Sequence, residues 1–156
     1  FGNTTLSGSH LNRATKRDEH KMKTSRINPP SLFDSRALGF SQVVVKKGSG
    51  KSIHVSGQVA WNADREITGE GDLYKQVLQS LRNLETALQH ASAALTDVVA
   101  LRTYIKESHI DDSAAISRGL IEVFGEELPC ATWIGVPRLA REEFLVEIEP
   151  TVVVAE

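Results

Sequence analysis

Two acidic side chains near the C-terminus have the spacing of a catalytic carboxylate carried on a strand. In the segment FLVEIEP, Glu147 and Glu149 alternate with apolar residues, so both carboxylates face one side of a predicted strand. A carboxylate beside a bound substrate can act as a general base that takes a proton from water. The same alternation is also typical of a solvated strand face, and the residues alone favour that second interpretation.

Two further side chains are candidates for chemistry, and each also has an ordinary structural interpretation. Ser56 precedes Gly57 in the segment VSGQV, and its hydroxyl could bind a ligand or lie on a strand beside a close packing contact. Cys130 has neither an evident His partner nor an electropositive setting, which favours a buried apolar cysteine over a nucleophile. With one Cys and no closely spaced pair among the five His, the sequence predicts no metal site.

Length and charge limit the class of protein. A chain of 156 residues with a formal net charge of -2 fits one domain, and it argues against a broad nucleic-acid surface. Residues 1–30 hold six Lys or Arg against two acids, whereas the remaining 126 residues hold twelve bases against eighteen acids. We therefore expect a basic, flexible tail over residues 1–30 and a folded domain over residues 31–156.

The only methionine, Met22, indicates a natural start within the tail. Residues 1–21 are then interpreted as an expression tag, an upstream extension or a transit segment. The chain has no run of about 18 apolar residues and no apolar segment typical of a secretory signal. We expect a cytoplasmic protein, or a mitochondrial one if the tail is a transit segment.

The elements that must position these side chains follow from periodicity. Apolar residues at helical spacing predict a helix from Asp72 to about Ala91, and a second helix that begins after Asp111 and Asp112 and ends at Gly125. Five strands are predicted in the segments SQVVV, KSIHVSGQVA, DVVALRTYIK, ATWIGV and FLVEIEPTVVV, with the first two paired as a hairpin. This order predicts an α+β fold with two helices on one face of a mixed sheet. Pro150 indicates either an edge strand or a bulge.

The segments VSGQV, QVLQSLRNLETAL, DVVALRTYI and FLVEIE, in that order, resemble the RidA/YjgF family of enamine and imine deaminases over residues 38–154. The resemblance implies a chorismate-mutase-like α+β fold and a homotrimer with active sites in the clefts between subunits. It also implies a small-molecule enamine or imine as substrate, no cofactor and no membrane partner. Water attacks the imine carbon in this reaction, and ammonia leaves.

The resemblance assigns roles to individual residues. Glu147 matches the carboxylate that positions the water, and Ser56, followed by Gly57, matches the serine of the SGQ signature. Phe40 stands where the family usually has Tyr, so the ring remains and the hydroxyl is lost. Arg118 stands where the family has Asn, if the second helix aligns without a gap.

The largest departure lies in the segment Pro129-Cys130-Ala131. The deaminases have Pro-x-Arg here, and the Arg holds the substrate carboxylate. Ala131 cannot bind an anion, so binding of a small 2-imino acid should weaken by roughly two or more decades unless another cation substitutes. Arg118 is the first candidate substitute, followed by Arg102 and Arg138. The backbone of Cys130 could still face the ligand, and Trp133, which stands where Cys is common, would narrow or line the cleft.

We therefore expect hydrolytic deamination of an enamine or imine other than small 2-aminoacrylate, with water positioned by Glu147. The alternative is a trimer of the same fold that binds a ligand or a protein without catalysis. A ribonuclease fits worst, because the acidic domain lacks a basic groove and no His pair is available for acid-base cleavage of RNA.

Overall fold

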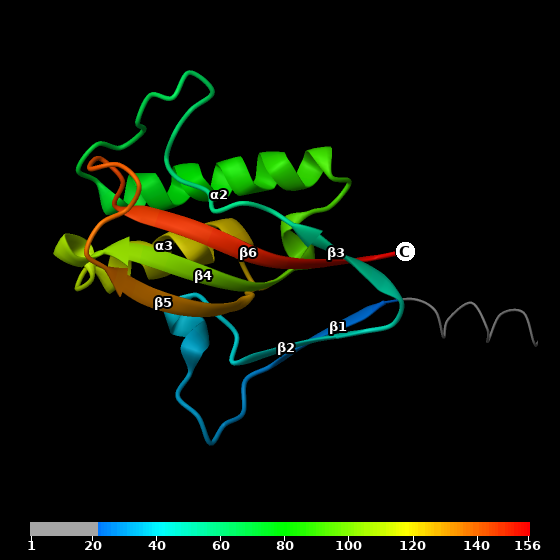
Figure 1. The fold of residues 1–156 in the computed structure, drawn as a ribbon. Coiled ribbons are helices and arrows are strands. Elements are labelled where there is room, and N and C mark those ends of the chain that lie inside the picture. The colour runs from blue at the N-terminus through cyan, green and yellow to red at the C-terminus, as the bar shows by residue number, and fades with distance from the viewer. Residues whose placement is uncertain (1–21) are drawn as a thin grey trace, which may run out of the picture.

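The computed structural model describes residues 22–156 (Figure 1). Two long helices and three short 3-10 turns lie between six strands. The strands are β1 Lys23–Ile27, β2 Val43–Lys47, β3 Gly50–His54, β4 Val98–Lys106, β5 Cys130–Val136 and β6 Val146–Ala155; the helices are α2 Leu73–His90 and α3 Ser113–Phe124; the 3-10 turns are η1 Ser35–Leu38, η2 Leu95–Asp97 and η3 Glu107–His109.

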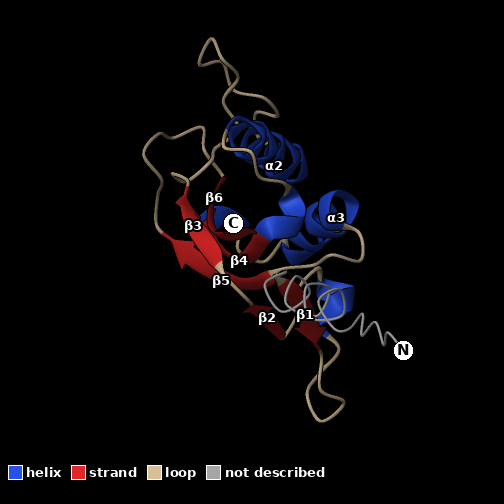
Figure 2. Cartoon of the chain, turned by 90° about the vertical axis from the view of Figure 1, so that its right-hand side faces the viewer, coloured by secondary structure: helices blue, strands red, loops and turns tan. Residues whose placement is uncertain are grey.

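The main sheet is mixed and has the strand order β3-β6-β4-β5. Strands β4 and β5 are parallel because α3 crosses between them, and the other two pairs are antiparallel. Helices α2 and α3 both cover one face of this sheet (Figure 2). The predicted α+β architecture, with two helices on one face of a mixed sheet, is confirmed.

Both predicted helices are present, and the predicted carboxylate cap of the second is Asp112. The Asp72 side chain accepts from the backbone N–H of Lys75 at the start of α2, and Asp112 accepts in the same way from Ala115 at the start of α3. Gly125 ends α3 with φ of +54°, a conformation that favours glycine. The apolar stripe of α2 is fully buried against the sheet, at Leu73, Val77, Leu81, Leu84 and Leu88.

The predicted hairpin between the first two strands is wrong. Strand β2 pairs with β1, from Lys23 opposite Lys47 to Ile27 opposite Val43, whereas β3 pairs with β6. The chain therefore leaves one sheet and enters another at the turn before Gly50. Strand β3 also ends at His54, well before the predicted end of that strand.

Part of the predicted tail is a strand. Residues 23–27 form β1, and Arg26 pairs with Glu127 and donates from Nε to the carbonyl of Leu128 at 3.1 Å. The folded domain thus begins before the predicted boundary at residue 31, because polar residues can form a strand when a neighbouring strand supplies the partners. The interpretations of residues 1–21 lie outside the described residues.

Pro150 lies at an irregularity and not at an edge. Strand β6 runs between β3 and β4, so Pro150 is on an interior strand. The preceding segment pairs with β6 at His54 opposite Thr151 and again at Gln58 opposite Ile148. One extra residue on the β3 side separates these two pairs, which is the bulge that proline without an N–H tolerates.

Candidate active site

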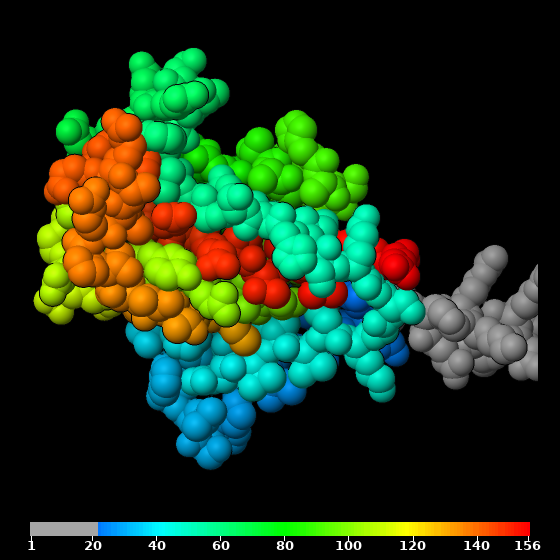
Figure 3. Space-filling model, in the orientation of Figure 1, coloured from blue at the N-terminus to red at the C-terminus, as the bar shows by residue number. Residues whose placement is uncertain are grey.

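A hollow of about 340 Å³ opens on the face of the sheet that the helices leave uncovered. Figure 3 shows this face, with β6 in red between the teal of β3 and the yellow-green of β4. Five residues line the hollow: Gly57, Tyr104, Leu139, Glu147 and Glu149. Two carboxylates therefore share one small, solvent-accessible site.

The alternation of β6 places both carboxylates there. Val146 and Ile148 are buried toward the helices, so Glu147 and Glu149 point to the opposite face. Tyr104 of β4 lies directly across from Glu147 in the antiparallel ladder and shares its face. The predicted alternation of this strand is confirmed.

Gly57 lies against the carboxylate of Glu147. A Cβ added at Gly57 would be 2.9 Å from Cδ of Glu147 and closer still to Oε1, so any side chain here would displace the carboxylate. Gln58 holds the segment in place by exchanging two backbone hydrogen bonds with Ile148, at 2.8 and 2.9 Å. Ser56 is exposed beside Gly57, and its carbonyl accepts from Nε2 of Gln58.

A buried amide fixes the start of β6. Gln76 of α2 is completely buried, and its Nε2 donates to the carbonyls of Gly69 and Glu143 at 3.1 and 2.9 Å. Its Oε1 accepts from the backbone N–H of Leu145 at 2.9 Å. Gln76 therefore joins two loops to the helix just before the chain reaches Glu147.

The second carboxylate of the hollow has two partners. The Tyr104 hydroxyl donates to Oε2 of Glu149 at 3.0 Å, and a guanidinium nitrogen of Arg102 lies 3.6 Å from Oε1. The hydrogen bond to Glu149, together with desolvation and the charge of that carboxylate, raises the pKa of the Tyr104 phenol above its ordinary value. Tyr104 is thus held as a protonated donor to Glu149.

Four of the predicted substrate-binding residues gather elsewhere, around β5. The ring of Phe40 contacts Trp133 edge to face, with centroids 6.2 Å apart, and Phe33 packs on Phe40 in the same way. Ala131 and Trp133 pack against the core on the helix side of the sheet. Cys130 is half-buried, and its thiol lies 3.7 Å from the carbonyl of Gln42.

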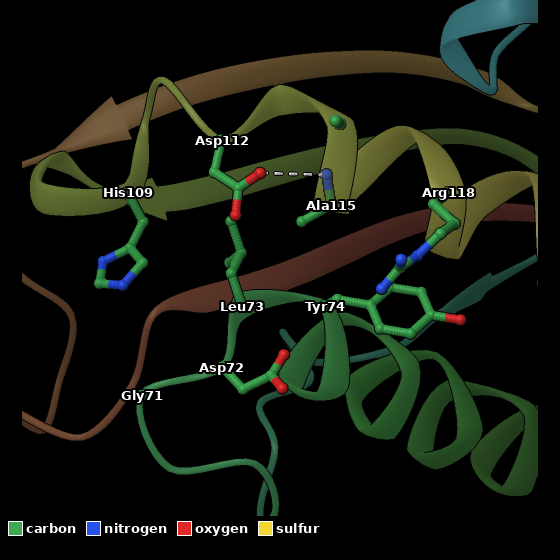
Figure 4. Close-up of a pocket in the computed structure, with 9 residues that line it drawn as sticks. Gly71, Asp72, Leu73, Tyr74, His109, Asp112, Ala115 and Arg118 are labelled. Carbon is green, nitrogen blue, oxygen red and sulfur yellow. Dashed lines mark hydrogen bonds between the residues drawn. The ribbon is translucent and has the colours of Figure 1, made fainter.

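Arg118 lies in a third place, on the helix layer. Its guanidinium carbon is 3.4 Å from the centroid of the Tyr74 ring, and the Tyr74 hydroxyl donates to Glu122. Figure 4 shows this stacking beside the N-terminal ends of α2 and α3, where Arg118, Asp72 and other residues line a separate hollow of about 580 Å³. Within one chain, Arg118 is therefore on the opposite side of the sheet from Glu147.

The family model described as Endoribonuclease L-PSP matches residues 34–154. The chain belongs to this family, also called Rid or YjgF. A RutC family protein of Pyrococcus abyssi is 31% identical over 100 residues, which cover 64% of this chain and 76% of the relative.

Solved structures of Rid-family proteins share the fold. A Rid-family protein of unknown function from Yersinia pestis, YyfB, is 39% identical, with a TM-score of 0.77 over 84% of this chain and 98% of that one. A YjgF family member from Mycobacterium tuberculosis is 28% identical, with a TM-score of 0.57 over 85% of this chain and all of that one. The two helices and the mixed sheet described above are therefore the Rid-family fold.

The resemblance led to Glu147 and Gly57, which the structure brings together, but it assigned no role to three other residues of the hollow. These are Tyr104, Leu139 and Glu149. The alternation of residues along β4 could have indicated that Tyr104 shares a strand face with Arg102. Leu139 lies in a loop without periodicity, so no pattern indicated it.

Within residues 22–156, neither helix combines the length and apolar character needed to span a bilayer.

Proposed function

We propose that this Rid-family protein hydrolyses a reactive enamine or imine, with Glu147 positioning the attacking water. The observation that supports the proposal is the carboxylate of Glu147 held against the backbone of Gly57 in an open hollow. Glu147 accepts a proton from water as the oxygen attacks the imine carbon. The resulting carbinolamine takes the proton on nitrogen, the C–N bond breaks, and a carbonyl product and ammonia leave.

We propose that the active unit is a homotrimer. Phe40 and Trp133 lie near β5, whereas Glu147 lies on the uncovered face of the sheet, so one chain holds two separated groups of the residues that the resemblance assigns to one site. A cleft between neighbouring chains would bring the two groups together. Sedimentation equilibrium should give a mass of three chains at micromolar concentration, and a monomer would contradict this assembly.

The substrate is an imine other than small 2-aminoacrylate. Position 131 carries Ala where the family resemblance predicts the Arg that binds a carboxylate, and the first candidate replacement, Arg118, stacks on Tyr74 in the helix layer. No cation within the described part of this chain lines the hollow of Glu147. Within residues 22–156 of one chain, the hollow therefore lacks the contact that would hold a small 2-imino acid.

The test is the release of ammonia or of carbonyl product from freshly generated imines. Glu147→Gln should abolish the acceleration over buffer, while Glu85→Gln, an exposed acid on α2, should retain it. A wild-type protein that accelerates neither a carboxylated nor a neutral imine would contradict the deaminase. The alternative, a non-catalytic binding protein, also predicts no acceleration of either imine. It predicts in addition that ligand binding survives Glu147→Gln.

The ribonuclease named in the description of the family model has less support. The hollow of Glu147 presents two carboxylates, which repel the phosphates of RNA. Cleavage of RNA that is lost in Glu147→Gln would favour that activity over deamination.

A further inference from the structure

The charge of the hollow indicates which imine it accepts. Glu147 and Glu149 both line it, and the side chain of Glu149 is 41% exposed. The cation paired with Glu149, Arg102, has a guanidinium nitrogen 3.6 Å from Oε1 of that carboxylate and is not one of the residues that line the hollow. Within the described part of one chain, the lining of the hollow therefore carries two carboxylates and no cation.

Glu149 is also held in a fixed position. The Tyr104 hydroxyl donates to Oε2, which leaves the outer lone pairs of the carboxylate free for a donor in the hollow. Tyr104 itself lies opposite Glu147 on the neighbouring strand. Two carboxylates with different partners thus face one space, one beside a glycine backbone and the other tied to a phenol.

Two other cations near the hollow have partners of their own, and a third, Arg138, is exposed beside the lining residue Leu139. Lys106, on the same face of β4, pairs with Glu142 and donates to its backbone carbonyl at 3.0 Å. Arg141 pairs with Glu143 at 2.9 Å and lies over the Trp61 ring. These contacts hold both cations along the loop that precedes β6.

We propose that Glu149, fixed by Tyr104, binds the nitrogen of a protonated imine and makes the site select imines without a carboxylate. This inference rests on the proposed deaminase function and names its substrate class. Glu149 is then a specificity-determining residue, and Tyr104 is a positioning residue that acts through it. A substrate carboxylate would lie near Glu147 or Glu149, and either neighbour repels it.

The reaction balances with these groups alone. One iminium ion and one water molecule give one carbonyl compound and one ammonium ion. Glu147 takes a proton from water as the C–O bond forms, and that proton reaches the amine nitrogen before the C–N bond breaks; the second proton of the water follows it to the nitrogen as the carbonyl forms. Glu149 exchanges no proton and is paired first with the iminium and finally with the departing ammonium.

Two imines that share a benzyl group on the imine carbon, a ketimine with a carboxylate and an aldimine without one, test the proposal. Phenylalanine with an amino-acid oxidase yields the carboxylated imine, and phenethylamine with an amine oxidase yields its counterpart without the carboxylate. The kcat/KM of the wild-type protein in its native assembly should be at least about ten-fold higher for the imine without a carboxylate. That factor is the effect of one charge contact between Glu149 and the iminium nitrogen. A preference for the carboxylated imine would overturn the substrate class and leave the deaminase intact.

Variants separate Glu149 from its surroundings. Glu149→Gln should lower kcat/KM for the imine without a carboxylate by about ten-fold, chiefly through KM, and should not lower it for the carboxylated one. Tyr104→Phe should have the same selective effect, with a smaller fall in kcat/KM for the imine without a carboxylate. Equal losses on both imines in Glu149→Gln would overturn the role of Glu149, and a selective loss on the carboxylated imine in Arg102→Gln would assign substrate binding to Arg102 instead.

The matched control is Glu85→Gln, which removes an exposed acid from the helix layer and should leave both values unchanged. Glu147→Gln reports on the reaction itself. If it abolishes turnover of either imine while the wild type shows no preference between them, deamination stands and the selection by Glu149 fails.

Discussion

The backbone of Gly57 and the carboxylate of Glu147 are in direct contact, so that a methyl group at Gly57 would occupy the space of the carboxyl group. The contact joins two segments about ninety residues apart in the chain, and the paired backbone bonds of Gln58 and Ile148 keep it in register. The small residue therefore determines where the proposed base lies.

Replacement of Gly57 by Ala should reduce activity more than stability. The new Cβ would push the Glu147 carboxylate away from its position, and a misplacement of about 1 Å can cost about 100-fold in rate. We expect kcat on an imine to fall by about that factor while circular dichroism stays native. Gly135→Ala is the matched control, since its Cβ would meet only Ile110 at 3.3 Å. A wild-type kcat in Gly57→Ala would show that this contact does not position the base.

Arg118→Ala tests the substitute cation that the sequence indicated. Because Arg118 stacks on Tyr74 in the helix layer, we expect its loss to leave kcat/KM unchanged for carboxylated and neutral imines alike. The free energy of unfolding should fall by about 0.5–1 kcal/mol, the usual contribution of an exposed cation–π contact. Arg82→Ala, at an exposed position of α2, controls for the loss of a helix arginine. A selective loss on the carboxylated imine would mean that a neighbouring chain brings Arg118 into the site.

The sequence predicted the helices well because their signals are local. The apolar stripe of α2 and the capping carboxylate Asp112 act within a few residues, and the structure confirms both. The alternation of Glu147 and Glu149 is equally local. It fixes which face of the strand both residues occupy whatever the partner strand is.

Strand pairing and the full site depend on contacts that no local pattern encodes. The partner of β2 is the segment Lys-Thr-Ser-Arg-Ile, whose mostly polar composition is typical of a tail. Leu128 and Glu127 stabilise it from about a hundred residues away. The resemblance grouped Arg118 and Trp133 with Glu147 by their place in a motif. The sheet separates them within one chain, which only the packing of the helices could reveal.

Gln76→Met should destabilise the protein strongly. The side chain is fully buried, and its loss would leave the carbonyls of Gly69 and Glu143 and the N–H of Leu145 without this partner. The Gly69 carbonyl keeps the backbone N–H of Asp72, so two groups lose their partner. Buried groups left unpaired cost about 1–3 kcal/mol each, so we expect the free energy of unfolding in urea to fall by roughly 2–6 kcal/mol. Gln89→Met, at an exposed position of the same helix, should change it little. Similar values for the two variants would show that water replaces the amide.

The phenol of Tyr104 should report on Glu149 directly. The chain has only two tyrosines, so Tyr74→Phe leaves Tyr104 as the single phenol in an absorbance titration at alkaline pH. Its hydrogen bond to Glu149 raises its pKa above 10.0, and we expect ionisation at a correspondingly higher pH than in a free tyrosine. Because the folded pKa is raised, the stability that this contact supplies is present below pH 10 and is lost as the pH rises through the folded pKa.

Removing the carboxylate completes that test. Glu149→Gln in the Tyr74→Phe background should move the titration midpoint of Tyr104 down toward 10.0, because the neutral amide no longer opposes formation of the phenolate. Glu122→Gln in the same background is the control, since Glu122 is the partner of Tyr74 and lies in the helix layer. A midpoint that does not respond to Glu149→Gln would show that Tyr104 and Glu149 are uncoupled in solution, and the positioning role of the phenol would fail with it.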